Sequence, residues 1–527
     1  MWDKIKETIG IEQPEEETTE RINTSQEEIE ITKDLKTNFN KLQANLAQSE
    51  DLKHKELFLG GNQNYKATVT YIASIINQNY LQKEILKPLM LNIKFTQPED
   101  IVSNVEKLAQ QLPLPIGQTE FISSLTEAIA EILEGKVVLF IDHFDQAFVL
   151  DIRELANRGV NSPKVEASTR GPQEAFTESL EVNLSLIRKR LRDNNLMLET
   201  YKLGARTQLD LGLLYIDDIA DKKILEQIRH RLNNIDLDGV IDTSYIDQYF
   251  QDNWKTPFPL SQNTERPDKA IHNLLEGKFV LILEGTPFIS IVPTTFIQFF
   301  QTPEDYYDTF YISTFMRFLR LIATFITISF PSIYISLVSF HHELLPTDLA
   351  LSIATTRQDV PFPSYLEALI MELSLELLRE SGIRLPGSIG QTIGIVGGLI
   401  LGEAAVNAGL VSPPMVIVVA TTAIASFVIP DYEAAIPLRL LRFPLMILAS
   451  FFSIYGIMIG WLLILIHLCS LESFNQPYFA PFAPIKISDL KDSIIRVPLR
   501  LMGQRPYSTA NQQKNRQDRK GESKDEA

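Results

Sequence analysis

The stretch LIATFITISFPSIYISLVSF, residues Leu321 to Phe340, divides this chain of 527 residues into two parts with different chemistry. It carries no formal charge, and its length is close to the ~20 apolar residues that a helix needs to cross a hydrocarbon core. Acids and bases crowd the chain before it, whereas residues 321–469 are mostly Leu, Ile, Phe, Val, Ala and Gly. The sequence therefore predicts a soluble part followed by a membrane part.

Further apolar segments follow this first candidate span. Residues 389–408 contain Glu403 as their only charge, residues 415–429 are uncharged, and residues 445–469 are interrupted by His467. No apolar signal-peptide core lies near the N-terminus, so we expect the first hydrophobic segment to target and anchor the chain. The long N-terminal part is then expected to stay in the cytoplasm.

Charges that flank the spans favour a cytoplasmic location for both ends. Arg317 and Arg320 precede the first span, and Lys and Arg are frequent in the C-terminal tail. The segment PFPSYLEALIMELSLELLRESGIRLP, residues 361–386, leaves the number of crossings open. Its Glu367, Glu372, Glu376 and Arg379 interrupt an apolar helix. Either this helix lies at the membrane surface, or it crosses the membrane among neighbouring helices.

The soluble part contains an internal repeat. ILEGKVVLFI at residues 132–141 returns as LLEGKFVLIL at residues 274–283, and TYIASIINQNYL at 70–81 resembles LYIDDIADKKIL at 214–225. Each LEGK element reads as a helix, a glycine turn at Gly135 or Gly277, and a buried strand. Two α/β subdomains of similar topology are therefore expected.

The predicted fold is α+β and multidomain, with two repeated cytoplasmic α/β subdomains followed by an α-helical polytopic membrane domain. The expected units, in chain order, are an acidic mobile tail (1–50), a first subdomain (51–164), a connecting helical segment (165–202), a second subdomain (203–316), the transmembrane domain (317–475) and a polar tail (476–527).

The connecting segment carries charges of both signs. Apolar residues recur at helical spacing from Phe176 to Leu191, and arginines alternate with glutamates around them. We expect this segment to make contacts between domains or subunits, rather than to bind an anion, through Arg170, Glu174, Arg188 and Arg190. The net charge of −17 also argues against a general affinity for nucleic acid.

A glycine recurs at every fourth position between Pro386 and Val406, at Gly390, Gly394, Gly398 and Gly402. In lipid such a face admits close approach of another helix backbone, so it is expected to be a packing ridge. Another stripe on the same segment could line a pore, with an apolar constriction and an acidic position; its members are Thr392, Val396, Leu399 and Glu403. Ordinary packing inside one subunit stays open as the alternative.

The sequence offers no catalytic constellation, so we expect the protein not to be an enzyme. Cys469 is the only cysteine, and the LEGK elements lack the GK[ST] ending of a P-loop. His341, His342 and Glu343 lie at the end of the first span without the HExxH spacing, and they are interpreted as an interfacial polar cap. No metal or cofactor is expected.

Several motifs together resemble the A subunits of the spore germination receptor family, the GerA type, of endospore-forming bacteria. They are STRGPQEAFTESLEVNLSLIRKRL (168–191), LEGKFVLILEGTPFISIVPTTFIQFFQTPEDYY (275–307), the stretch from PFPSYLEAL to VSPP (361–414) and YFAPFAP (478–484). The resemblance covers roughly Asp51 to Arg500 and departs from the family chiefly in the two polar tails.

The resemblance implies a function that composition and periodicity do not show. Members look like the A component of nutrient germinant receptors in the spore inner membrane, beside a transporter-like B subunit and a lipoprotein C subunit. The A component is expected to form a homo-oligomer that acts as a nutrient-gated ion channel, with membrane lipid around it. The alternative is a non-conducting scaffold that relays the signal from its partners.

Overall fold

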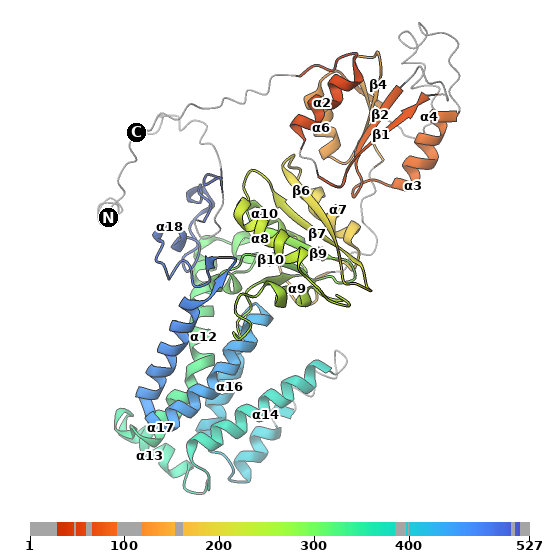
Figure 1. Cartoon of the computed structure of the whole chain (residues 1–527). Coiled ribbons are helices and arrows are strands. Elements are labelled where there is room, and N and C mark those ends of the chain that lie inside the picture. The colour runs from red at the N-terminus through yellow and green to blue at the C-terminus, as the bar shows by residue number, and fades with distance from the viewer. Residues whose placement is uncertain are drawn as a thin grey trace, which may run out of the picture.

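The computed structural model describes residues 29–46, 49–59, 66–91, 119–152, 162–384, 397–398, 400–506 and 512–516, and every structural statement below concerns these residues. Along the chain, two antiparallel five-stranded sheets are followed by a group of long helices, and a C-terminal segment (residues 471–506 and 512–516) then returns to the second sheet (Figure 1).

The first subdomain is a sheet in the strand order β1-β2-β4-β5-β3. Its strands are β1 (Leu52–Phe58), β2 (Lys66–Ile72), β3 (Thr119–Ile122), β4 (Val137–Ile141) and β5 (Ala147–Leu150), and its helices are α2 (Leu35–Asn45), α3 (Gln78–Tyr80), the π-helix η2 (Leu81–Leu86), α4 (Lys87–Leu91) and α6 (Leu125–Leu133). Helices α2 and α6 share one core through Leu42, Leu125 and Ile132, which are buried. The expected mobile tail is therefore wrong for residues 29–46, because their apolar side chains complete this core; residues 1–28 lie outside the described residues.

The second subdomain repeats this topology with the order β6-β7-β9-β10-β8. Its strands are β6 (Leu196–Leu203), β7 (Leu209–Ile216), β8 (Gln262–Thr264), β9 (Phe279–Leu283) and β10 (Ile289–Val292), and its helices are α7 (Leu180–Arg190), α8 (Lys222–Asn233), α9 (Thr243–Phe250), α10 (Pro267–Leu275), the 3-10 helix η3 (Phe296–Phe300) and α11 (Glu304–Tyr307). Strand β6 pairs with β7 along its whole length. The second sheet thus begins before the expected boundary at residue 203.

The LEGK repeat forms the same local structure in both subdomains. Gly135 follows α6 with φ 89°, and Gly277 follows α10 with φ 87°. A side chain at either position would clash in this left-handed conformation, which glycine adopts freely. Each glycine turns the chain from a helix into a strand whose residues are all buried, β4 or β9.

The helical half contains α12 (Phe310–Ser339), α13 (Thr347–Thr356), α14 (Ser364–Arg384), a helix over residues 400–407, α16 (Pro413–Phe427) and α17 (Tyr432–Ser470). By length and composition, α12 and α17 are the helices of the described chain that are long and apolar enough to cross a membrane. Helix α12 begins at the second subdomain and leads away from it, as Figure 1 shows.

Helix α17 is a hairpin of two antiparallel arms, residues 432–452 and 454–470. Ser453 between them has φ 55° and ψ −135°, which is not helical. A Cβ atom on Gly456 would lie 2.1 Å from the Leu448 carbonyl oxygen, and one on Gly460 would lie 2.2 Å from Leu445 Cδ1. In a straight helix, residues 445 and 460 would be about 22 Å apart. The predicted single span at 445–469 is therefore wrong, because the turn lies inside it.

The C-terminal segment contains β11 (Glu472–Ser473), β12 (Gln476–Pro477), α18 (Ile487–Leu490) and the 3-10 helix η5 (Leu499–Leu501). Phe474 inserts into the core of the second subdomain, where its ring meets that of Phe250 edge to face. The predicted polar tail is corrected for 476–506 and 512–516, since these residues contact the folded subdomain. Residues 507–511 and 517–527 lie outside the described residues.

Candidate functional site

The residues predicted to make contacts in the connecting segment all have partners within the chain. Arg188 donates to Asp51 (Nη2 to Oδ1, 2.7 Å) and to Ser49 (Nη2 to Oγ, 2.9 Å), and it is buried between the two subdomains. Arg170 pairs with Asp308 at 2.8 Å, and Arg190 pairs with Glu174. Helix α7 is shorter than the predicted helix because residues 171–179 are not helical.

A buried charge cluster joins the start of α12 to two other segments. Arg317 donates to Asp305 (Nε to Oδ2, 2.9 Å) and lies 3.0 Å from Asp492 Oδ1, while Arg320 donates to the same Asp305 at 2.9 Å. The sequence suggested that these arginines only set the orientation in the membrane. The structure shows that they tie α12 to the segment before it and to the C-terminal segment.

Helix α17 is tied to the second subdomain at both of its ends. At its start, Glu433 accepts a hydrogen bond from Asn263 at 3.1 Å, and Asp431 lies 4.0 Å from Lys269. At its end, Thr256 Oγ1 lies 3.0 Å from His467 Nε2. A displacement of the second subdomain would therefore act directly on α12 and on both arms of α17.

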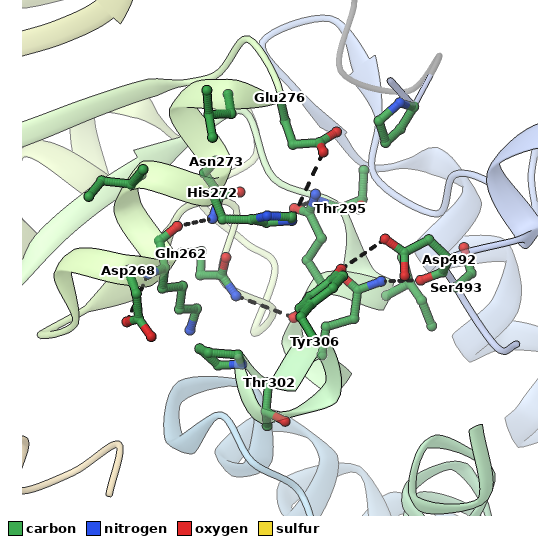
Figure 2. A pocket seen from close by; sticks show the side chains of 18 of the residues that line it. Gln262, Asp268, His272, Asn273, Glu276, Thr295, Thr302, Tyr306, Asp492 and Ser493 are labelled. Carbon is green, nitrogen blue, oxygen red and sulfur yellow. Dashed lines mark hydrogen bonds and ion pairs between the residues drawn. The ribbon is translucent and has the colours of Figure 1, made fainter. Parts of the chain in front are cut away.

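A cavity of about 300 Å³ lies beside this junction, between the second subdomain and the C-terminal segment (Figure 2). Helix α10 contributes His272 and Glu276, the segment after η3 contributes Tyr306, and the C-terminal segment contributes Asp492. Tyr306 donates its hydroxyl to Asp492 at 2.8 Å, and its ring lies 4.8 Å from that of His272 between centroids. Burial raises the pKa of Tyr306, so it stays a neutral donor.

The two LEGK lysines have different environments. Lys136 pairs with Glu131, whereas Lys278 is buried and donates to the neutral amide oxygen of Asn273 at 2.7 Å. Asn273 occupies the repeat position of Glu131, since both spacings are 142 residues (131 to 273 and 136 to 278). Burial without a carboxylate partner lowers the pKa of Lys278 to about 7.

The lowered pKa of Lys278 predicts that the free energy of unfolding depends on pH. Its folded value of about 7 lies below the ~10.4 of an unfolded chain, so the unfolded state binds more protons between these values. Stability is then expected to rise with pH from about 7 to 10, by at most about 1.4 kcal/mol per unit from this group. Across that range, the melting temperature of Lys278→Met should rise less steeply with pH than that of the wild type. Lys136, whose pKa is raised by Glu131, is the matched control: Lys136→Met should leave the slope unchanged, and an equal effect of both variants would contradict the prediction.

Helix α14 has charged residues on its inner face over its first four turns and several apolar residues exposed, whereas Glu380 and Arg384 near its end are exposed. Glu372 and Arg442 are fully buried and form an ion pair at 2.7 Å, whereas Leu377 is 64% exposed. Glu367, also buried, accepts from Arg357 and from the Ser412 amide at 2.8 and 3.0 Å. A soluble protein usually shows the reverse distribution, with most apolar side chains inside and most charges at the surface. The predicted charges of this helix thus face its neighbours.

The predicted ridge and stripe are described only in part. Gly390, Gly394, Thr392, Val396 and Leu399 lie outside the described residues. A Cβ atom on Gly402 would contact Val416 of α16 at 3.4 Å, so this glycine packs inside the chain, whereas one on Gly398 would meet no described atom within 4 Å.

Glu403 is exposed on the helix over residues 400–407, and Asn407 is exposed one turn later. Residues four apart share a helix face. The sequence reasoning missed Asn407, although the same four-residue spacing that linked Leu399 to Glu403 would have found it.

Comparisons with known proteins show which family this chain resembles. The profile of the family described as Bacillus/Clostridium GerA spore germination protein matches residues 40–508. Spore germination protein KA of Bacillus subtilis is 39% identical, covering 92% of this chain and 89% of its own, and the uncharacterized membrane protein YfkQ of the same organism is 41% identical, covering 86% and 88%. Spore germination protein GerLA of Bacillus cereus is 38% identical, covering 88% and 92%.

One solved structure is also similar, the N-terminal domain of the A subunit of the Bacillus megaterium spore germinant receptor GerK3. It is 29% identical, with a TM-score of 0.39, over 51% of this chain and 97% of that one. The family profile and the relatives agree over nearly the whole length of the chain. The chain therefore belongs to the GerA family of spore germination proteins.

Proposed function

We propose that the chain is the A subunit of a nutrient germinant receptor in the spore inner membrane, and that several copies form a nutrient-gated cation channel. The transporter-like B subunit and the lipoprotein C subunit are its proposed partners, and no enzymatic step is part of the proposal. The names of the relatives, all spore germination or membrane proteins, support this role.

A multi-pass arrangement is supported by the helical half. Exposed apolar residues on α14, with paired charges on its inner face, suit a helix whose surroundings are lipid. Helix α12 begins at the second subdomain, and α17 ends there. The chain therefore leaves and returns on one side, which agrees with a cytoplasmic location for both ends.

The single observation that carries the channel proposal is the exposed polar face of the helix over residues 400–407. Glu403 and Asn407 lie on it, while Ile400 nearby is also exposed. A carboxylate facing lipid is costly, so this face requires water or another protein surface. Copies arranged around an axis would provide both, with Glu403 as an acidic ring that favours cations.

A non-conducting scaffold is the second candidate, and the packing of Gly402 favours it. Because Gly402 contacts α16 of the same chain, part of the predicted ridge serves packing inside one subunit. The size of the purified complex in detergent separates the two candidates. A ring of about four or more A subunits supports the channel, and a monomer or dimer supports the scaffold.

The variant Glu403→Gln tests the channel proposal. It keeps the shape of the side chain and removes its charge, so it should leave the amount of subunit unchanged and lower the local concentration of cations. Potassium release from spores after addition of nutrient is expected to slow several-fold. Glu343→Gln, at another exposed glutamate at the end of the first span, is the control and should release potassium at the normal rate. Normal release by Glu403→Gln at normal abundance would remove this residue from the ion path.

A further inference from the structure

The cavity of Figure 2 contains a buried carboxylate oxygen that lacks a partner. Glu276 is 7% exposed; its Oε1 pairs with Arg516, and its Oε2 has no hydrogen-bond partner among the residues that the structure describes. An acceptor left unpaired away from water costs about 1–3 kcal/mol, and more when it is charged. A cationic donor in the cavity would remove this cost.

The other charged groups around the cavity already have partners. Asp268 accepts two hydrogen bonds from Arg266, and Asp492 lies between Arg317 and Tyr306. Lys269 is held by Glu166 at 2.6 Å. Unlike these groups, Glu276 has a carboxylate oxygen, Oε2, that lacks a hydrogen-bond partner among the described residues.

The group next to Glu276 suits the same ligand. His272 Nε2 lies 4.0 Å from Glu276 Oε1, and 38% of the His272 side chain is accessible although protein surrounds the ring. Figure 2 shows His272 and Glu276 side by side within the cavity. Burial lowers the pKa of His272, so the ring is neutral and adds no positive charge beside Glu276.

The first subdomain lacks this arrangement at the matching position. Glu134 is the repeat counterpart of Glu276, at the same spacing of 142 residues (134 to 276). It pairs with Arg192 at 2.8 Å and is 37% exposed. The unpaired oxygen is thus a property of the second subdomain, where the C-terminal segment covers α10, and does not follow from the shared LEGK sequence.

The remaining lining is apolar. Ile271, Leu275 and Ile297 come from the second subdomain, and Pro481 and Pro506 come from the chain after the last membrane helix. The volume of about 300 Å³ is at the lower end of the range for small-molecule sites. We propose that this cavity binds a small organic ammonium ion, with its charged group against Glu276 Oε2 and its apolar body between α10 and the C-terminal segment.

Such a ligand would add to the contacts between α10 and the C-terminal segment, which already meet through Arg505 and Leu275 and through Arg516 and Glu276. It would join α10 to the C-terminal segment, whose Asp492 binds Arg317 at the head of α12. Occupancy would therefore stabilise the segment against the second subdomain. The site does not depend on the channel proposal, because it concerns binding within one chain.

Calorimetric titration of the full chain in detergent with benzylammonium chloride tests the proposal. Benzyl alcohol is the matched uncharged probe, since it has nearly the same shape. We expect benzylammonium to bind at least about tenfold more tightly than benzyl alcohol, and Glu276→Gln to lose that preference. Glu134→Gln should keep it. Equal binding of the two probes, or no binding of benzylammonium up to about 10 mM, would overturn the proposal.

A second pair of variants separates ligand binding from loosening of the C-terminal segment. Arg516→Gln removes a competing cation and leaves Glu276 in place, so benzylammonium should bind as tightly as before or more tightly. Leu275→Trp adds bulk at a lining residue without changing the charge of the cavity and should weaken binding. Loss of binding in Arg516→Gln would mean that the probe depends on the contact made by the C-terminal segment rather than on the carboxylate. Unchanged binding in Leu275→Trp would mean that the probe binds elsewhere. Either result rejects the site.

Discussion

Asp305→Ala is expected to destabilise the protein by about 3–5 kcal/mol, because it leaves buried arginines without their shared counter-ion. Arg317 and Arg320 both donate to Asp305, and all three side chains are buried at the head of α12. Removing one partner from such a cluster costs far more than the pair contributes, since the remaining charges stay away from water. Thermal unfolding in detergent and the amount of subunit in the membrane both measure this loss.

Asp308→Ala is the matched control. Asp308 forms an ion pair with Arg170 at 2.8 Å, but both side chains are more than a third exposed. Exposed pairs contribute about 0–1 kcal/mol, so this variant should unfold close to the wild type. Similar losses for the two variants would show that the buried cluster is not what holds α12 to the soluble half.

Gly456→Ala is expected to have an effect of similar size, by separating the two arms of α17. Its new Cβ atom would lie 2.1 Å from the carbonyl oxygen of Leu448, which is backbone and cannot rotate away. Overpacking at this point should cost about 3 kcal/mol or more, although alanine is the better helix former. The subunit should be depleted from the membrane and should melt at a lower temperature.

Two other glycines provide graded controls. A Cβ atom on Gly460 would meet a side-chain methyl group of Leu445, which can shift, so Gly460→Ala should cost less than Gly456→Ala. Gly398→Ala meets no described atom within 4 Å and should leave the stability of a single chain unchanged. Equal stability of all three variants would mean that the arms do not pack as closely as the structure shows.

The sequence predicted the repeated subdomains well because the repeat is local. Each LEGK element combines an apolar helix, a glycine that permits positive φ and a buried strand, and these preferences act over about ten residues. Gly135 and Gly277 therefore mark equivalent turns. The domain boundaries were harder to place, since β6 joins its sheet through pairing with β7 rather than through a pattern of its own.

One sequence signal indicates the hairpin in α17, namely the spacing of two glycines. Gly456 and Gly460 form a second small-residue spacing of four, the same kind of pattern that drew attention to residues 390–402. The apolar composition around Ser453 gave no sign of a turn, because lipid-facing and helix-facing positions are both apolar. Length alone therefore suggested one span.

The charged residues at the candidate site could be identified from the sequence, but their partners could not be predicted. Arg317 was interpreted as a membrane flank, yet its partners Asp305 and Asp492 lie 12 and 175 residues away along the chain. The same holds for Glu276 and Arg516, which are 240 residues apart. Such contacts depend on how the C-terminal segment folds back, and no local preference encodes that path.

The insertion of Phe474 into the second subdomain sets an order for biosynthesis. The core around Phe250 closes only when a residue that follows every membrane helix has left the ribosome. Until then the second subdomain has an unfilled apolar site in its core, even if its own strands have already paired. A chain cut short within the helical half would leave that site open, so the second subdomain is complete only when the helices that precede Phe474 have also been made.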